Sequence, residues 1–261
     1  MRKPIRIALA VLLGSIVGVI AWQVLRRPVY QGKTLSSWIL QHARSSEPPN
    51  QDRAAQVSAE IAICRIGTNG LPTLLAWAGM RDSWFRKKML TLMSDEVRWK
   101  SRVLSANDYH AGASYGFGVL KSIAKPAVPS LTKLLNDSDP NIRSGAAFCL
   151  CQIGPAAAEA VPALLQSLDD PEAQSNAFAA LRSIGVKPDV LVPVLIGYLS
   201  STNMGQRDWV VSPLSELGTD AKAAVPKLLE SLDSSEAGLR RAATNLLRKI
   251  DPDAAAKAGV K

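Results

Sequence analysis

A short signature that recurs along the chain constrains the fold more than any other feature. An isoleucine or leucine followed by a small residue or aspartate closes six segments, with a first step of 57 residues and later steps of 30 to 33. Prolines open five segments with steps of 57, 33, 31 and 33. Two independent anchors that keep one period of this length predict an array of stacked structural repeats. The closing pairs are Ile66-Gly67, Ile123-Ala124, Ile153-Gly154, Ile184-Gly185, Leu217-Gly218 and Ile250-Asp251, and the prolines are Pro72, Pro129, Pro162, Pro193 and Pro226.

One copy of the repeat, residues 125–154, predicts a helical hairpin. Its first half carries Pro129 at a helix start and apolar residues at helical spacing, such as Leu131. The turn formers of residues 136–140 separate this half from a second helix, which Gly154 ends. Two helices of this size cannot bury their apolar faces alone, so neighbouring hairpins are expected to stack.

The pattern AxPxLxxLLxDxxPxxRxxAxxxLxxIG, seen most fully in this copy, resembles HEAT repeats. Residues 155–185 and 219–250 match it well, whereas residues 186–218 depart from it at Ser200-Ser201 and at Pro213. The resemblance covers residues 52–261. It implies an all-α fold, an α-solenoid of stacked helical hairpins.

The N-terminal region predicts a membrane anchor. Residues 1–6 are basic, and Ile7 to Leu25 form an uncharged run of 19 residues, close to the length that crosses a bilayer. A cleaved signal peptide is the alternative, but the run is long for one and no small-residue cleavage site follows it. We expect an uncleaved single-pass helix in the bacterial inner membrane, with the body on the periplasmic side.

The charge of the chain belongs mostly to this anchor. The formal net charge is +9, and residues 1–33 supply six basic residues and no acid, leaving 25 basic and 22 acidic residues in the remainder. The body therefore carries only a modest positive charge, and its composition does not indicate a nucleic-acid partner.

Between the anchor and the solenoid, residues 26–51 are expected to form a polar link and a capping helix over 34–44. The 57-residue step predicts an insertion at residues 80–109, with seven basic and four acidic residues and several apolar ones. We expect a longer first helix and a covering helix packed on the stack; the alternative is a contact surface for lipid head groups or an acidic partner. Membrane-anchored bacterial HEAT proteins are similar, with a GFxxLG…AVPxL segment that Gly116-Phe117 and residues 127–131 match, Ile123-Ala124 replacing Leu-Gly.

No residue pattern predicts catalysis. Gly112–Gly116 form a G-x-S-x-G string, but no strand precedes the serine as a nucleophile elbow requires. His42 and His110 are too few for a zinc site, which needs three protein ligands or more. The three cysteines are expected to be small, partly buried apolar residues. We therefore expect no catalytic residue, metal, cofactor or small-molecule substrate.

Charged residues near the turns predict a structural ladder. In HEAT-like repeats, an arginine early in the second helix and an acid in the preceding turn resemble rungs that join a turn to the next helix. We expect these residues to be structural. The members are Asp137, Arg143, Arg207, Asp233 and Arg240.

A binding face is expected on the second helices. Positions five and eight before each closing residue lie opposite the core side of the helix, where second helices of solenoids usually line the concave surface. Aromatic residues there would be exposed and typical of an interface; the alternative is that a loop or the insertion covers them. The candidates for protein binding are Tyr115, Phe148, Asn176 and Trp209.

The sequence thus predicts a membrane-anchored scaffold that binds another protein through the solenoid and has no catalytic activity. The alternative comes from the resemblance: short HEAT-like arrays also occur in bilin lyases, which act on a chromophore and its carrier protein. No residue of the chain marks a chromophore site, and an N-terminal anchor is unexpected for that role.

Overall fold

The computed structural model describes residues 28–46, 51–93, 104–201 and 203–260. The basic residues 1–6, the candidate anchor 7–25 and part of the insertion lie outside the described residues. The chain divides into two compact units, Met1–Pro126 and Ala127–Lys261. We call them unit 1 and unit 2.

Unit 1 begins with a small β-hairpin where the sequence predicted only a polar link. Strands β1 (Val29–Tyr30) and β2 (Lys33–Thr34) pair antiparallel. The two residues between them, Gln31 and Gly32, have φ angles of 48° and 74°, as a tight hairpin turn requires. Trp38 fixes the hairpin, because its Nε1 donates a hydrogen bond to the carbonyl oxygen of Tyr30 at 3.1 Å.

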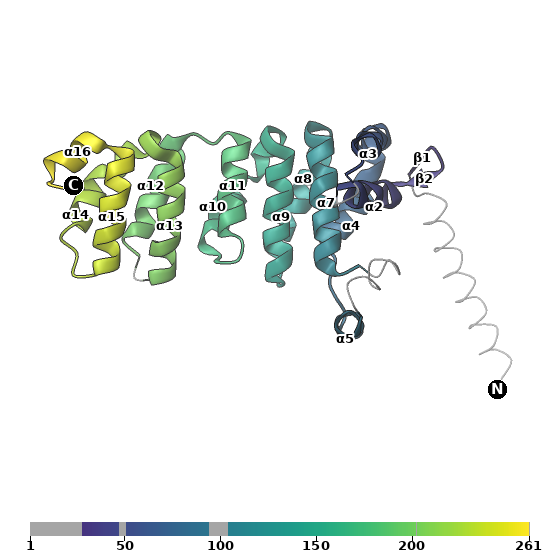
Figure 1. Cartoon of the computed structure of the whole chain (residues 1–261), viewed down its shortest axis with the longest axis horizontal. Helices are drawn as coiled ribbons and strands as arrows, with labels where there is room; N and C mark the ends of the chain where they lie inside the picture. Colours follow the sequence, from purple (N-terminus) through teal and green to yellow (C-terminus); the bar gives the residue numbers. More distant parts are fainter. Residues whose placement is uncertain (1–27, 47–50, 94–103, 202, 261) are drawn as a thin grey trace. The chain divides into compact units, whose positions relative to one another are not determined.

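Two helical hairpins follow in unit 1 (Figure 1). The first joins α2 and α3, and the second joins α4 and α7 with α5 between them in the chain. The approach of α4 and α7 is close, since a Cβ on Gly116 would lie 2.6 Å from Leu74 Cδ2. The elements are α2 (Leu35–Ser46), α3 (Arg53–Ile66), η1 (Gly67–Gly70), α4 (Leu71–Ala78), α5 (Trp84–Leu92) and α7 (Ala106–Leu120).

Unit 2 is a stack of four helical hairpins, α8–α9, α10–α11, α12–α13 and α14–α15 (Figure 1). The fold class is therefore the all-α solenoid that the sequence predicted. The helices are α8 (Val128–Leu134), α9 (Pro140–Ile153), α10 (Val161–Gln166), α11 (Gln174–Ile184), α12 (Pro188–Leu199), α13 (Met204–Leu217), α14 (Val225–Ser231), α15 (Ala237–Ile250) and α16 (Pro252–Lys257), with 3-10 turns η3 (Gly154–Ala160), η4 (Ser167–Asp169) and η5 (Gly218–Ala224). The 3-10 turn η2 (Lys121–Ala127) spans the boundary between the two units in the chain.

The structure corrects the repeat register at one point. The pair expected to close the second repeat was Ile123-Ala124, but α7 ends at Leu120, and Lys121 takes the positive φ (46°) that glycine takes elsewhere. Ile123 is 43% exposed, whereas Leu120 is buried. Leu120-Lys121 is therefore the closing pair, and it also fills the Leu-Gly place of the GFxxLG segment.

With this correction the repeat becomes more regular. The steps between closing residues are 54, 33, 31, 33 and 33, so the extra length of the inserted segment is about 22 residues beyond one repeat. The position seven before the closing residue is small and fully buried in every repeat, which lets the helices pack closely. Its occupants are Ala59, Ala113, Ala146, Ala177, Val210 and Ala243.

One described stretch, Pro140–Asp169, is long and apolar enough to cross a membrane by composition. In the fold it is not one straight helix, because Gly154 has a φ of 71° and Ala157 has non-helical angles. Leu150, Leu164 and Leu168 are fully buried inside unit 2. The stretch therefore forms core hairpins of the stack.

Candidate functional site

The candidate site is the side of α9, α11, α13 and α15 that points away from the buried positions of unit 2. We call it the second-helix face. Helical geometry places positions one, two, five, eight and nine before each closing residue on this side. Its principal residues are Ser144, Phe148, Ser175, Asn176, Arg182, Ser183, Trp209, Ser212, Glu216, Arg241, Asn245 and Lys249.

Side-chain bonds between α9 and α11 hold the first part of this face. Asn176 Nδ2 donates to both the carbonyl oxygen and the hydroxyl of Ser144, at 3.2 and 3.0 Å. Ser183 Oγ donates to the carbonyl oxygen of Cys151 at 2.7 Å. Asn176, expected to bind a partner, is half-buried and uses its amide to join two repeats.

The same kind of bond continues to the C-terminal helices. Arg182 forms an ion pair with Glu216 at 2.5 Å, and Lys249 Nζ donates to Ser215 Oγ at 2.8 Å. Each of these bonds joins residues about one repeat apart, so the spacing of the second helices is set by their own side chains. A face held in this way is pre-organised for binding, because less ordering has to occur when a partner arrives.

Phe148 is the exposed aromatic of this face. Its side chain on α9 is 40% exposed, as the sequence predicted for this position. Cys149, its neighbour in the chain, is buried instead, and this burial raises the pKa of its thiol to about 12. Phe148 therefore presents a large apolar surface among polar residues that are bonded to one another.

Trp209 has a different place from the expected one. The sequence predicted an exposed aromatic with no packing role, but the side chain is half-buried and lies edge-on against two rings. The ring centroids are 6.4 Å from Phe178 on α11 and 5.7 Å from Tyr198 on α12. Its Nε1 donates to Ser175 Oγ at 3.3 Å. The expectation is wrong because neighbouring helices bring aromatic side chains to this position.

Tyr198 is itself fixed by a polar contact below the Trp209 ring. Its hydroxyl donates a hydrogen bond to Asp169 Oδ1 at 2.8 Å. Burial raises the pKa of Tyr198, and the bond to Asp169 raises it further. The phenol therefore stays neutral over the physiological range, and the three rings form one aromatic cluster of Phe178, Tyr198 and Trp209.

Tyr115 belongs to unit 1, and the expectation that it is an exposed aromatic is also wrong. Its ring stacks on His42 of α2 with centroids 4.0 Å apart, and its hydroxyl is buried without a hydrogen-bond partner among the described residues. Burial raises the pKa of Tyr115, with a smaller contribution from Glu60. The cause is helix α2, whose His42 covers the side chain.

The arginine ladder exists, but its acids come from the following repeat. Arg143 Nε and Nη2 donate to the two carboxylate oxygens of Asp170 at 2.6 and 3.2 Å. Arg207 Nη2 donates to both oxygens of Glu236, the nearer at 2.8 Å. Both acids lie just before the second helix of the next repeat: Asp170 is four residues before Gln174, and Glu236 is four residues before Arg240. Each arginine–carboxylate pair therefore joins one repeat to the next.

The acids expected as rungs have other contacts. The backbone carbonyl oxygen of Asp137 accepts a hydrogen bond from the Arg143 guanidinium at 3.0 Å. The Asp137 carboxylate accepts a hydrogen bond from the backbone N–H of Asp139. Arg240 likewise donates to two turn carbonyls, those of Ser234 and Ser235, at 2.7 and 2.8 Å. The residue before α15 that bears the ladder carboxylate is Glu236, in place of the expected Asp233.

Replacement of Asp170 tests the ladder. The bond from Arg143 holds the pKa of Asp170 below its usual value of 3.8, against the opposing effect of burial. Its contribution to stability is therefore complete at neutral pH and is lost as the pH falls from 3.8 through the lower pKa of the folded state. Asp170→Asn should lower the free energy of unfolding by about 1–2 kcal/mol at pH 7 and by much less at pH 3. Urea unfolding at both pH values measures this.

The control for that experiment is Glu216→Gln, because the Arg182–Glu216 pair is about half exposed, with side-chain values of 46% and 48%. Its loss should be below about 1 kcal/mol. Equal losses for Asp170→Asn at pH 7 and pH 3 would contradict the assigned charge contribution.

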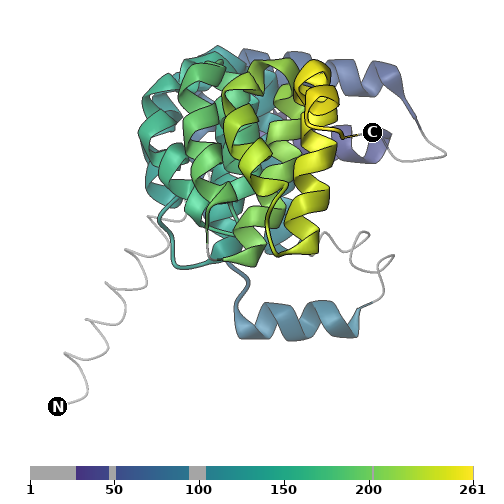
Figure 2. The same ribbon diagram turned by 90° about the vertical axis from the view of Figure 1, so that its left-hand side faces the viewer.

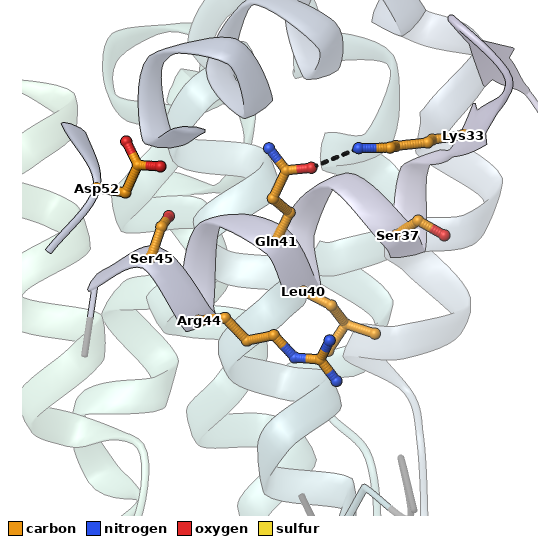
Figure 3. A pocket seen from close by; sticks show the side chains of 7 residues that line it. All are labelled: Lys33, Ser37, Leu40, Gln41, Arg44, Ser45 and Asp52. Carbon is orange, nitrogen blue, oxygen red and sulfur yellow. Dashed lines mark hydrogen bonds between the residues drawn. The ribbon is translucent and has the colours of Figure 1, made fainter. Parts of the chain in front are cut away.

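A polar pocket of about 520 Å³ lies beside α2 in unit 1 (Figure 3). Lys33 Nζ donates to Gln41 Oε1 at 2.8 Å, and Gln41 Nε2 donates to the carbonyl oxygen of Ala55 at 3.3 Å. Asp52 accepts the N–H of Ala55, which caps α3. These polar groups serve the α2–α3 hairpin, so we assign no ligand to the pocket. Its lining is Lys33, Ser37, Leu40, Gln41, Arg44, Ser45 and Asp52.

The G-x-S-x-G string lies inside α7, as the sequence predicted. Ser114 is 6% exposed, and its hydroxyl donates to the carbonyl oxygen of Ala111 at 2.9 Å. This is the ordinary back-bonding of a serine within a helix. Within the described residues, no group of three or more potential metal ligands comes together.

Stacked helical hairpins with a small buried residue at one register position define an α-solenoid repeat protein. A family model described as HEAT repeats matches residues 116–185 and 161–248, which together cover just over half of the chain. The chain therefore belongs to the HEAT-repeat family. A search of the curated proteins finds no match.

The chain is also similar to several solved structures. An engineered protein is 21% identical, with a TM-score of 0.39 over 82% of this chain and 96% of its own. A designed armadillo repeat protein in complex with the peptide (KR)4 is 17% identical, with a TM-score of 0.37 over 82% and 99%. A chain from a structure of Kap95p binding to RanGDP is 18% identical, with a TM-score of 0.43 over 94% and 35%. The family assignment depends on the repeat model alone.

Proposed function

We propose that this protein is a membrane-anchored, non-catalytic scaffold that binds another protein through the second-helix face. The observation that supports it most is Phe148, a large aromatic left 40% exposed on a face where Asn176 and Ser183 already bond to the neighbouring repeat. Exposed aromatics on rigid surfaces are common anchors of protein interfaces.

The charge at the other end of the face indicates what the partner offers. Helix α15 contains no acid, and Arg241, Arg248 and Lys249 are exposed on it. The carboxylates of an acidic segment would interact favourably with these basic side chains, and complementary charge also speeds association. The proposed partner therefore presents an apolar side chain to Phe148 and carboxylates to α15.

Photo-crosslinking tests this proposal. A photo-reactive phenylalanine analogue replaces Phe148 in one version of the chain and Leu229 in another. Leu229 is a suitable control because it is 36% exposed but lies on α14, a first helix. In native membranes, position 148 should give a discrete crosslinked protein and position 229 should not. Identical products from both positions, or none from position 148, would exclude this face.

Phe148→Ala should separate binding from folding. Because the side chain is exposed, its truncation should change the melting temperature little. Capture of the protein identified by crosslinking should weaken at least about tenfold, as for an interface hot spot. The measurement pairs thermal unfolding with titration of the purified partner. Unchanged affinity would remove Phe148 from the binding site.

Membrane attachment through residues 7–25 is part of the same proposal. The uncharged run of 19 residues should hold the chain in the membrane through carbonate extraction. The N-terminal sequence of the extracted protein should begin at or next to Met1. A soluble chain that starts between Trp22 and Tyr30 would mean that the run is a cleaved signal peptide.

A further inference from the structure

Helix α5 leaves an apolar stripe without a partner among the described residues. The helix has no buried residue, and both Figure 1 and Figure 2 draw it clear of the ribbons of α2, α3 and α4. Phe85 is 66% exposed, Leu92 is 77% exposed and Met89 is 39% exposed. Because these residues follow the i, i+4, i+7 spacing, they form one stripe along the helix. A stripe of this kind usually faces a core.

A side of α5 adjacent to the stripe is tied to unit 1. The Arg86 guanidinium lies 3.9 Å from Asp82 and over the ring of Tyr109, at 5.6 Å from its centroid. Asp82 also accepts the N–H of Ala106 at the start of α7. Ser83 caps the helix by accepting the N–H of Arg86. The helix is therefore held through Arg86 and its N-terminus, and these contacts leave the apolar stripe exposed.

Basic and aromatic residues flank the stripe. Lys88 is exposed on one flank of the stripe, and its Nζ lies 5.4 Å from the centroid of the Trp84 ring, which is 74% exposed. Lys87 is exposed on the side of the helix away from the stripe. The helix contains no acid. An apolar stripe bordered by a lysine and a tryptophan, with a second lysine on the polar side, has the composition of helices that lie in the membrane interface.

We propose that α5 lies on an anionic phospholipid surface, with Phe85, Met89 and Leu92 among the acyl chains and Lys88 beside the phosphates. Charge complementarity favours this occupant, because acidic head groups attract Lys87 and Lys88. The 19-residue run in the same chain would keep α5 near the bilayer, so a helix too short to bind strongly alone gains a high effective concentration. The contact does not depend on the protein-binding role of the second-helix face.

Hydrogen exchange on the full chain tests the contact. The protein is inserted into nanodiscs made of phosphatidylcholine alone or of phosphatidylcholine mixed with phosphatidylglycerol. If the purified protein does not insert, it is added to the same two kinds of nanodisc from solution. A short exposed helix exchanges its amides quickly, whereas a lipid-bound helix is protected. Amides of residues 84–92 should exchange at least about tenfold more slowly in the anionic nanodiscs than in the neutral ones. Amides of α9 should exchange equally in both.

Two double variants identify the groups responsible. Lys87→Glu with Lys88→Glu, and Phe85→Ser with Leu92→Ser, should each remove the protection of residues 84–92. The matched control, Lys133→Glu with Lys257→Glu, reverses two exposed lysines of α8 and α16 and should leave that protection unchanged. Equal exchange in both kinds of nanodisc would overturn the proposal, whether the helix is exposed in both or covered by protein in both. Protection that survives the lysine reversal would also overturn it.

Discussion

Trp209→Ala is expected to lower the free energy of unfolding of unit 2 by about 2–4 kcal/mol, somewhat less than the loss at a fully buried tryptophan. The side chain is half-buried, and it lies edge-on against both Phe178 and Tyr198. Its removal deletes two aromatic contacts and opens a cavity between α11 and the α12–α13 hairpin. The hydrogen bond from its Nε1 to Ser175 is lost as well.

Trp84→Ala is the matched control for this experiment. It removes the same side chain from a position that is 74% exposed, so its effect on unfolding should be within about 0.5 kcal/mol. Urea unfolding followed by circular dichroism measures both variants. If Trp209→Ala were as stable as the wild type, the aromatic cluster would carry no packing energy, and Trp209 would again be a candidate for partner binding.

Leu150→Ala is expected to cost about 2–5 kcal/mol, the range for a leucine removed from a close-packed core. Leu150 is fully buried on α9, three residues before the closing Ile153. Because the structure can collapse only partly around the missing side chain, a cavity remains. Chemical denaturation of the full chain measures the loss.

Cys151→Ser, one residue further along α9, provides the comparison. Cys151 is only half-buried, and the hydrogen bond that Ser183 makes there goes to its backbone carbonyl oxygen, which the change retains. Its cost should therefore be well below that of Leu150→Ala. Equal losses for the two variants would mean that the buried side of α9 is wrongly assigned.

The repeat itself could be predicted from the sequence. The closing pair of the second repeat could also have been placed correctly from the prolines. Apolar spacing and turn residues determine each hairpin locally, so α3 and α9 end at the expected Ile66 and Ile153. The second repeat was misplaced because lysine stands where glycine was expected. The proline anchor gave the correct position, since Pro129 follows Leu120 by nine residues, as Pro162 follows Ile153.

The ladder partners were harder to find. The sequence predicted an arginine next to the acid of its own turn, because that pair is close in the chain. The long arginine side chains instead reach acids of the following repeat. Asp170 is 27 residues after Arg143, and Glu236 is 29 residues after Arg207. Such a partner depends on how one hairpin stacks on the next, which no local pattern contains.

What the sequence alone determined is the class of fold, since hairpins with periodic apolar faces can be buried only by stacking. What only the tertiary structure decided is which outward positions remain exposed. Tyr115 and Phe148 are both aromatics five residues before a closing residue, yet His42 covers the first and the second is 40% exposed. Trp209 is partly covered by Phe178 and Tyr198 from other helices. Helical spacing gives the direction of a side chain from its own helix, but its exposure depends on side chains that the fold brings from elsewhere.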